Sequence, residues 1–142
     1  MSVGDHDDIR VLLDDWAQAL RDKDADAIIA CESPNIRAFS LAAPLETIGN
    51  DRAGLQAWLD TWEGGLEFEI RNTDLRVGGD IAWCSALARL AGRKIGTGES
   101  GLWFRLTVAF AREDGRWKIA HTHESVPFAM EGQPLALLDL KP

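Results

Sequence analysis

The stretch AFAREDGRWKIAHTHESVPF, at residues 109–128, consists of two alternating segments separated by the tripeptide Glu-Asp-Gly. Asp-Gly between two runs of β-forming residues is a strong hairpin signal, because glycine readily adopts the positive φ that such a turn requires. The second segment carries two histidines two positions apart, His121 and His123. This stretch predicts a β-hairpin, and the sequence upstream is expected to cover one of its faces.

Three amphipathic segments precede the strands. Apolar residues spaced three and four apart predict a first helix over residues 5–22, which begins in a run of aspartates. Asp24 is placed to cap a second helix over residues 25–31. Asn50 or Asp51 is placed to cap a third helix, which ends before Gly64 and Gly65. A short strand at residues 36–41 is expected between the second and third helices.

From Leu66 onward the apolar residues recur at every second position, which is typical of strands. The glycine-rich residues 92–101 are expected to form a flexible loop rather than a phosphate cradle. Helices followed by a series of strands indicate an α+β fold, with three N-terminal helices packed on a curved, mostly antiparallel sheet in one domain over residues 1–142. The predicted strands are residues 66–77, 81–90, 102–112 and 117–126.

Composition narrows the functional classes. The formal charge of −8 argues against nucleic acid and against an anionic membrane surface, since both need clustered Lys and Arg. No apolar run approaches the length of a membrane span. Two cysteines, Cys31 and Cys84, do not make a disulfide framework, so we expect a cytoplasmic protein. The apolar tail after residue 134 is expected to pack on the domain or on a neighbour.

Four segments carry a family resemblance: LRDKDADAI (20–28), PNIRAF (34–39), TIGNDRAGLQAWLDTW (47–62) and REDGRWKIAHTHES (112–125). In this order they resemble the cone-shaped, cystatin-like fold of nuclear transport factor 2-like proteins, ketosteroid isomerase and SnoaL-like polyketide cyclases. The last segment is most similar to the association (hub) domain of calcium/calmodulin-dependent kinase. The resemblance implies an internal pocket for a small organic molecule. We expect no cofactor, because the sequence carries no distinct motif for a nucleotide, a flavin or a metal.

The isomerase provides a chemical test of the resemblance. Its tyrosine corresponds to Trp16, its aspartate base to Ser40, and its second aspartate to Thr107 or Val108. Indole and hydroxyl groups cannot replace a carboxylate base at neutral pH. Steroid isomerisation by that mechanism is therefore not expected, and the Asp-Arg-Asp set of limonene-epoxide hydrolase also has no match.

The turn length decides which side chains share a face, because a shift of one residue inverts every side chain. A three-residue turn is favoured, and a two-residue turn would exchange the partnerships. The favoured turn groups Leu106, Val108, Thr122 and Glu124 under the helices, with Trp16 opposite them. Toward the rim of this predicted pocket we place three polar residues: Ser40, Arg89 and Glu124.

Arg89 matches a basic position in the hub cavity, and an Arg89–Glu124 ion pair would let each group offset the other's desolvation. Such a pair fits a ligand site and a purely structural role equally well. Glu124 and Val108 stand where the hub has further arginines, so the resemblance does not carry over a ligand.

The same turn length places His121 and His123 on the opposite face. No third metal ligand lies near them, so we expect no metal site and favour histidines hydrogen-bonded within the sheet. A general acid or base role for His121, His123 or Glu124 is the alternative. That same face is predicted to carry an interface for a homodimer through Trp103, Arg105 and Trp117.

Two functions fit these features. The first is a pocket protein that binds a small organic molecule and carries out cofactor-free isomerase, cyclase or lyase chemistry. The second is a non-catalytic oligomerisation or ligand-sensing module that resembles the kinase hub. Both share one fold, so the fold does not decide between them.

Overall fold

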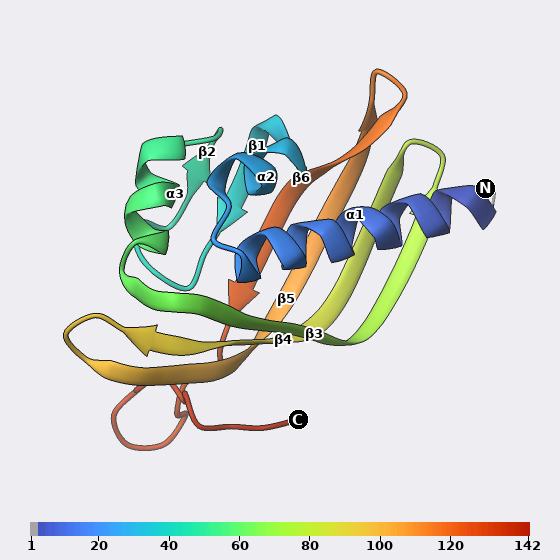
Figure 1. Ribbon diagram of the computed structural model, residues 1–142. Coiled ribbons are helices and arrows are strands. Elements are labelled where there is room, and N and C mark those ends of the chain that lie inside the picture. The colour runs from blue at the N-terminus through green and yellow to red at the C-terminus, as the bar shows by residue number, and fades with distance from the viewer. Residues whose placement is uncertain (1–2) are drawn as a thin grey trace.

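The computed structural model describes residues 3–142, and in it three helices lie against one face of a six-stranded sheet (Figure 1). The strand order is β2-β1-β6-β5-β4-β3, with β1 and β6 parallel and the other neighbours antiparallel. The predicted α+β cone, with its mostly antiparallel sheet, is therefore confirmed. The elements are α1 (Val3–Arg21), α2 (Ala25–Ala30), β1 (Glu32–Phe39), β2 (Thr47–Ile48), α3 (Arg52–Leu59), β3 (Trp62–Gly78), β4 (Ile81–Lys94), β5 (Gly98–Glu113) and β6 (Arg116–Ser125).

Aspartates start the two shorter helices. The Asp24 carboxylate accepts a hydrogen bond from the Ala27 N–H at 3.1 Å, and the Asp51 carboxylate accepts one from the Gly54 N–H at 3.0 Å. Each bond satisfies an amide that has no partner inside its own helix. Asp24 is thus the cap that the sequence predicted, and Asp51 rather than Asn50 caps α3.

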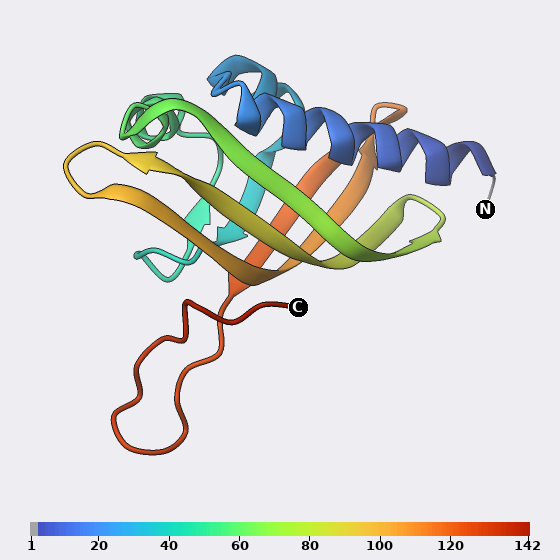
Figure 2. The same ribbon diagram turned by 60° about the horizontal axis from the view of Figure 1, so that its bottom comes forward.

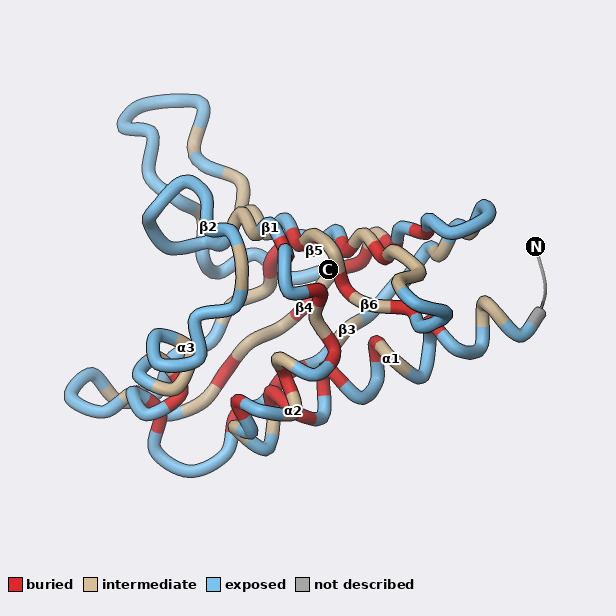
Figure 3. Tube along the Cα trace, turned by 90° about the horizontal axis from the view of Figure 1, so that it is seen from above, coloured by how far each residue is buried: buried red, intermediate tan, exposed pale blue. Residues whose placement is uncertain are grey.

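Helix α1 crosses the strands diagonally on one side of the sheet (Figure 2). We call this side the inner face, and it carries Phe68, Ala88, Phe104 and Leu106, all at least nine-tenths buried. The opposite side, the outer face, carries the alternate residues of the same strands. Buried positions concentrate along α1 and the strands beneath it (Figure 3). Burying one large apolar side chain contributes about 1.5–3 kcal/mol, so this layer dominates the stability.

The β5–β6 hairpin turns through two residues, Asp114 and Gly115, and not through three as predicted. Next to the turn, Phe110 pairs with Ile119 on the inner face. A bulge at Ala120 then shifts the register, so that Ala109 pairs with His121. An extra residue in one strand reverses the alternation of the side chains beyond it. The predicted assignment of side chains to the two faces is therefore wrong between the turn and the bulge, and it is confirmed beyond the bulge.

The glycine-rich segment is strand on both sides of a three-residue turn, so the prediction of a ten-residue loop is wrong. Two of its glycines permit close packing. A Cβ on Gly92 would lie 3.0 Å from the Trp62 ring, and one on Gly101 would lie 2.9 Å from the Ala91 Cβ. Glycine inside a strand often marks such a close approach.

After β6 the chain runs to the side of the sheet opposite α1 and forms a protruding loop (Figure 2). This loop is closed by a bridge between Phe128 and Ala136. Leu138 and Leu140 then contribute to a hollow on the outer face but are still about half exposed. The expected packing of the tail on its own domain is thus only partial. None of the described helices is long and apolar enough to cross a membrane.

Candidate functional site

The bulge in β6 places Thr122 and Glu124 on the inner face, paired with Val108 and Leu106. Thr122 is buried, whereas Glu124 is only partly exposed to solvent. Burial raises the pKa of the Glu124 carboxyl, and a hydrogen bond from the Leu41 N–H lowers it to a smaller extent. No ion pair within residues 3–142 involves Glu124. The Glu124 carboxyl group is therefore able to act as a general base or a general acid on a bound ligand.

A second carboxyl group, that of Glu32, lies at the start of β1. The register places it beside Ile119, which is fully buried on the inner face. The Asn50 amide donates a hydrogen bond to Glu32 Oε1 at 3.1 Å. Burial raises the pKa of Glu32, and the nearby Trp16 indole N–H and Asn50 amide lower it to a smaller extent. The indole N–H favours the charged carboxylate, yet its geometry falls short of a hydrogen bond.

Glu32 and Asn50 were not among the predicted site residues. The predicted strand began at residue 36, so Glu32 fell into a presumed connection, and Asn50 was considered only as a helix cap. No local pattern in the sequence indicates that the Glu32 side chain faces the core.

The predicted floor of the pocket is closely packed. Leu106 and Val108 are 1 % exposed, and Trp16, which makes an edge-to-face contact with Phe68 at 5.7 Å, is 6 % exposed. These residues and Thr122 are together on the inner face as predicted. In the structure these residues belong to the packed core, whereas the side chains of Glu32 and Glu124 are partly exposed.

Arg89 is not at this site. It lies between Ala88 and Leu90 in β4, and the alternation that buries Ala88 turns Arg89 to the outer face. There it is 3.7 Å from the Glu67 carboxylate. The predicted Arg89–Glu124 pair is therefore wrong, because the two side chains are on opposite faces of the sheet. Ser40 is exposed, just beyond β1.

His121 and His123 lie on the outer face, where both make edge-to-face contacts with Phe39. The His121 Nδ1 lies 2.6 Å from the Arg37 carbonyl oxygen. No cluster of metal-ligating side chains occurs among the described residues. The histidines are separated from Glu124 by the sheet, so they do not share a site with it.

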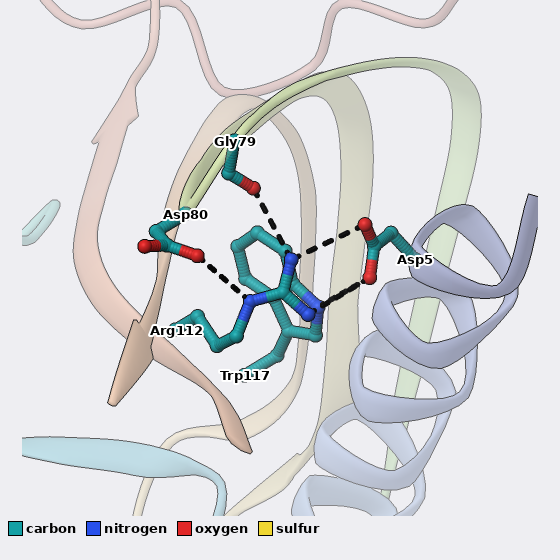
Figure 4. Close-up of polar contacts among 5 residues, drawn as sticks. All are labelled: Asp5, Gly79, Asp80, Arg112 and Trp117. Carbon is teal, nitrogen blue, oxygen red and sulfur yellow. Dashed lines mark hydrogen bonds and ion pairs between the residues drawn. The ribbon is translucent and has the colours of Figure 1, made fainter. Parts of the chain in front are cut away.

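Of the three predicted interface residues, Trp103 and Arg105 lie on the outer face. There the Arg71 guanidinium lies 4.7 Å from the Trp103 ring. Trp117 does not share that face: it is 8 % exposed, and its indole lies next to Asp5 at the start of α1 (Figure 4). The bulge is the reason. Before Ala120 the odd-numbered side chains of β6 lie on the inner face, and after Ala120 the even-numbered ones do.

Two hollows among residues 3–142 lie elsewhere. One, of about 400 Å³, lies between the tail and the outer face, and its lining includes Arg89 and Trp103. The other, of about 470 Å³, lies between α1 and α2 and includes Cys31. Neither contains Glu32 or Glu124.

Comparison with known families agrees with this architecture. The model of the SnoaL-like domain family matches residues 9–129. The chain belongs to the SnoaL-like family. No curated protein matches the sequence significantly.

Solved structures extend the comparison of this SnoaL-like chain. An NTF2-like protein of unknown function from Pseudomonas putida KT2440 is 34% identical, with a TM-score of 0.88, over 100% of this chain and 99% of that one. A candidate dehydratase of the NTF2-like family from Streptomyces avermitilis is 14% identical, with a TM-score of 0.75, over 86% and 95%. The S. rosetta CaMKII hub is 20% identical, with a TM-score of 0.68, over 84% and 94%. The last two show a shared fold only.

Proposed function

We propose that this protein binds a small organic molecule beside its inner face and catalyses cofactor-free proton transfer on it. The observation that carries the proposal is a pair of partly exposed inner-face carboxyl groups, Glu32 and Glu124, without an ion-pair partner among residues 3–142. A carboxyl group whose pKa is raised toward neutrality is a better general base or acid at physiological pH.

Glu124 is the better candidate for the catalytic group. Its side chain is partly exposed, and the Leu41 N–H that partly offsets the rise in its pKa belongs to the exposed loop that follows β1, the side from which a substrate would approach. In an isomerase reaction it would remove a proton from the carbon next to a carbonyl group and return it to another carbon of the same molecule. In a dehydratase reaction it would remove the same proton while the C–O bond at the neighbouring carbon breaks, and the hydroxyl group would take up the proton and leave as water. The dehydratase proposed for the Streptomyces avermitilis neighbour is a lyase, which agrees with this reaction class.

A proton-exchange assay tests the proposal without knowledge of the natural substrate. The probe is 2-tetralone in deuterated buffer, and NMR measures the rate at which its C–H groups next to the carbonyl exchange with solvent. We expect the wild type to accelerate the exchange and Glu124→Gln to lose most of that acceleration. Glu69→Gln, on the outer face beside Arg71, is the control and should behave as the wild type. Equal rates with and without protein would contradict the proposal for this class of ketone.

A second candidate function is self-association through the outer face. Ile81 and Trp83 are 62 % and 45 % exposed on that face, and Trp103 and Arg105 lie on it as well. Clusters of exposed apolar side chains commonly mark interfaces. Fold neighbours that include a CaMKII hub support self-association, and a homodimer is our proposal. Sedimentation should show a dimer that Trp83→Ala with Arg105→Glu dissociates; a wild-type monomer would contradict it.

The other predictions from the sequence stand as predictions. We expect no cofactor, one SnoaL-like domain over residues 1–142 and a cytoplasmic location, since both cysteines are free thiols.

A further inference from the structure

We propose that the hollow between the C-terminal tail and the outer face binds a flat organic carboxylate, with its ring beside Trp103 and its carboxylate group on Arg89. The hollow has a volume of about 400 Å³, which is within the usual range for a pocket that binds a small organic molecule. It lies on the side of the sheet opposite α1 (Figure 2). The inference therefore goes beyond the inner-face function proposed above.

The hollow has a floor because two facing residues on the outer face are small. Ala91 in β4 pairs with Gly101 in β5, and both line the hollow. Two positions along the strands, and so on the same face, Arg89 pairs with Trp103. The floor is thus bordered by two large side chains that also line the hollow. Ile81 and Trp83, which belong to the proposed interface, lie toward the opposite end of β4.

The tail supplies an apolar wall. Leu138 and Leu140 line the hollow and are 53 % and 47 % exposed, so each has apolar surface that a ligand can cover. A flat ring in the hollow would contact these leucines and the Trp103 indole. Burial of apolar surface and contact with an aromatic ring both favour binding.

Arg89 supplies the polar anchor. Among residues 3–142 its guanidinium has one polar partner, the Glu67 carboxylate, and their separation of 3.7 Å is longer than a hydrogen bond. A guanidinium group has five N–H donors and can give two parallel hydrogen bonds to one carboxylate. The Arg89 side chain is 37 % exposed, so these donors are accessible to a ligand.

The charges around Trp103 favour an anionic ligand over a cationic one. The Arg71 guanidinium lies 4.7 Å from the Trp103 ring, and Arg89 is the cross-strand partner of Trp103. Arg105 lies two positions along β5 on the same face. It donates to the Ser125 hydroxyl at 3.0 Å and has no carboxylate partner within the described part of the chain. A ligand ammonium group beside Trp103 would therefore be repelled by three guanidinium groups.

Three carboxylates also line the hollow, and they restrict the position and charge of the anion. Glu67 and Glu99 each lie 3.7 Å from an arginine, and Asp139 comes from the tail together with Lys141. Glu99 lies four residues before Trp103 in β5, so the ligand anion is expected at the Trp103 end of the hollow. A phosphate monoester carries up to two charges and would be repelled by these carboxylates more strongly than a carboxylate ligand.

Two isosteric probes test the site. 2-Naphthoate and 2-naphthamide share one flat ring system, but only the first carries a charge. In NMR titrations of the ¹⁵N-labelled protein we expect naphthoate to bind roughly tenfold more tightly, because its hydrogen bonds to Arg89 are charge-assisted. Arg89→Gln should bring the two affinities close together. Arg76→Gln is the matched control and should keep the preference, because Arg76 pairs with Asp74 outside the hollow.

The wild-type titration also locates the ligand, without any variant. Naphthoate should shift the Trp103 indole resonance and the Gly101 amide resonance and leave the Glu124 amide resonance in place. Equal affinities for the two probes, a preference that survives Arg89→Gln, or shifts confined to other residues would overturn the site. The absence of binding by either probe would overturn it as well. The tetralone exchange assay reports on Glu124, on the other face of the sheet, so the proposed function and this site can fail independently.

Discussion

The Asp5 carboxylate, in the first turn of α1, accepts hydrogen bonds from both terminal nitrogens of Arg112, near the end of β5, at 2.9 and 3.2 Å (Figure 4). The same guanidinium donates to Asp80 at 2.9 Å and lies 4.5 Å from the Trp117 ring. One arginine thereby joins α1 to the β3–β4 turn and the β5–β6 hairpin. Its pKa is raised mainly by the hydrogen bonds to Asp5 and Asp80, so it stays charged.

Asp5→Asn should lower the melting temperature, because it leaves the Arg112 guanidinium with a neutral partner in a partly buried place. Asp26→Asn is the matched control. It breaks an ion pair of 2.6 Å with Arg52 that is exposed on both sides, and it should have no measurable effect. Equal melting temperatures for the wild type and Asp5→Asn would show that the contact does not stabilise the start of α1.

The Glu124→Gln variant should have a higher free energy of unfolding than the wild type at about pH 7.5, and this difference should disappear at about pH 4. The folded pKa of Glu124 is raised above its ordinary value of 4.5. Above the folded pKa the carboxylate is charged in both states, and its burial destabilises the fold by the full amount. As the pH falls through the folded pKa the folded protein takes up the proton, and the penalty disappears below the unfolded pKa. Urea unfolding at a series of pH values measures this, and a constant difference across the range would refute it.

Trp117→Ala should lower the free energy of unfolding by about 3–5 kcal/mol, the usual cost of removing a buried aromatic side chain. Trp83→Ala, on the exposed outer face, should change it by less than about 0.5 kcal/mol at concentrations that keep the protein monomeric. Chemical unfolding followed by circular dichroism measures both. Similar costs for the two variants would contradict the placement of Trp117 in the core.

Gly92→Ala should destabilise the protein by about 1–3 kcal/mol, because the new methyl group would press on the Trp62 ring. Gly78→Ala is the control, since no heavy atom lies within 4 Å of the added Cβ and its φ is not positive. It should be neutral or stabilise the protein by up to about 1 kcal/mol. Thermal unfolding of the two variants provides the comparison, and a neutral Gly92→Ala would show that Trp62 moves aside easily.

The sequence was sufficient for the architecture because its periodicity and helix caps are local. Apolar spacing located α1 to within two residues at its N-terminal end, and the position of Asp24 ahead of a short apolar run correctly predicted a cap. The turn at Asp114 and Gly115 was also located correctly, because Asp-Gly specifies its own backbone conformation.

The candidate site was predicted less well because it depends on register. Counting alternate positions outward from the turn assigns Trp117 and His121 to one face, and only the pairing with β5 reveals the bulge between them. Arg89 was placed by resemblance to the hub, whereas the burial of Ala88 decides its facing. The Glu32–Asn50 contact joins residues 18 apart through the packing of α3, and no local pattern encodes it.

Because of the single additional residue at Ala120, the two parts of β6 place residues of different numbering on the inner face. Trp117 and Ile119 are buried there near the turn, and Thr122 and Glu124 lie there beyond the bulge. If the same sequence continued without the bulge, His121 would pair with Val108 and His123 with Leu106, and imidazoles would take the inner-face positions of Thr122 and Glu124. The bulge, and not the hairpin turn, therefore decides which chemical groups of β6 face the helices.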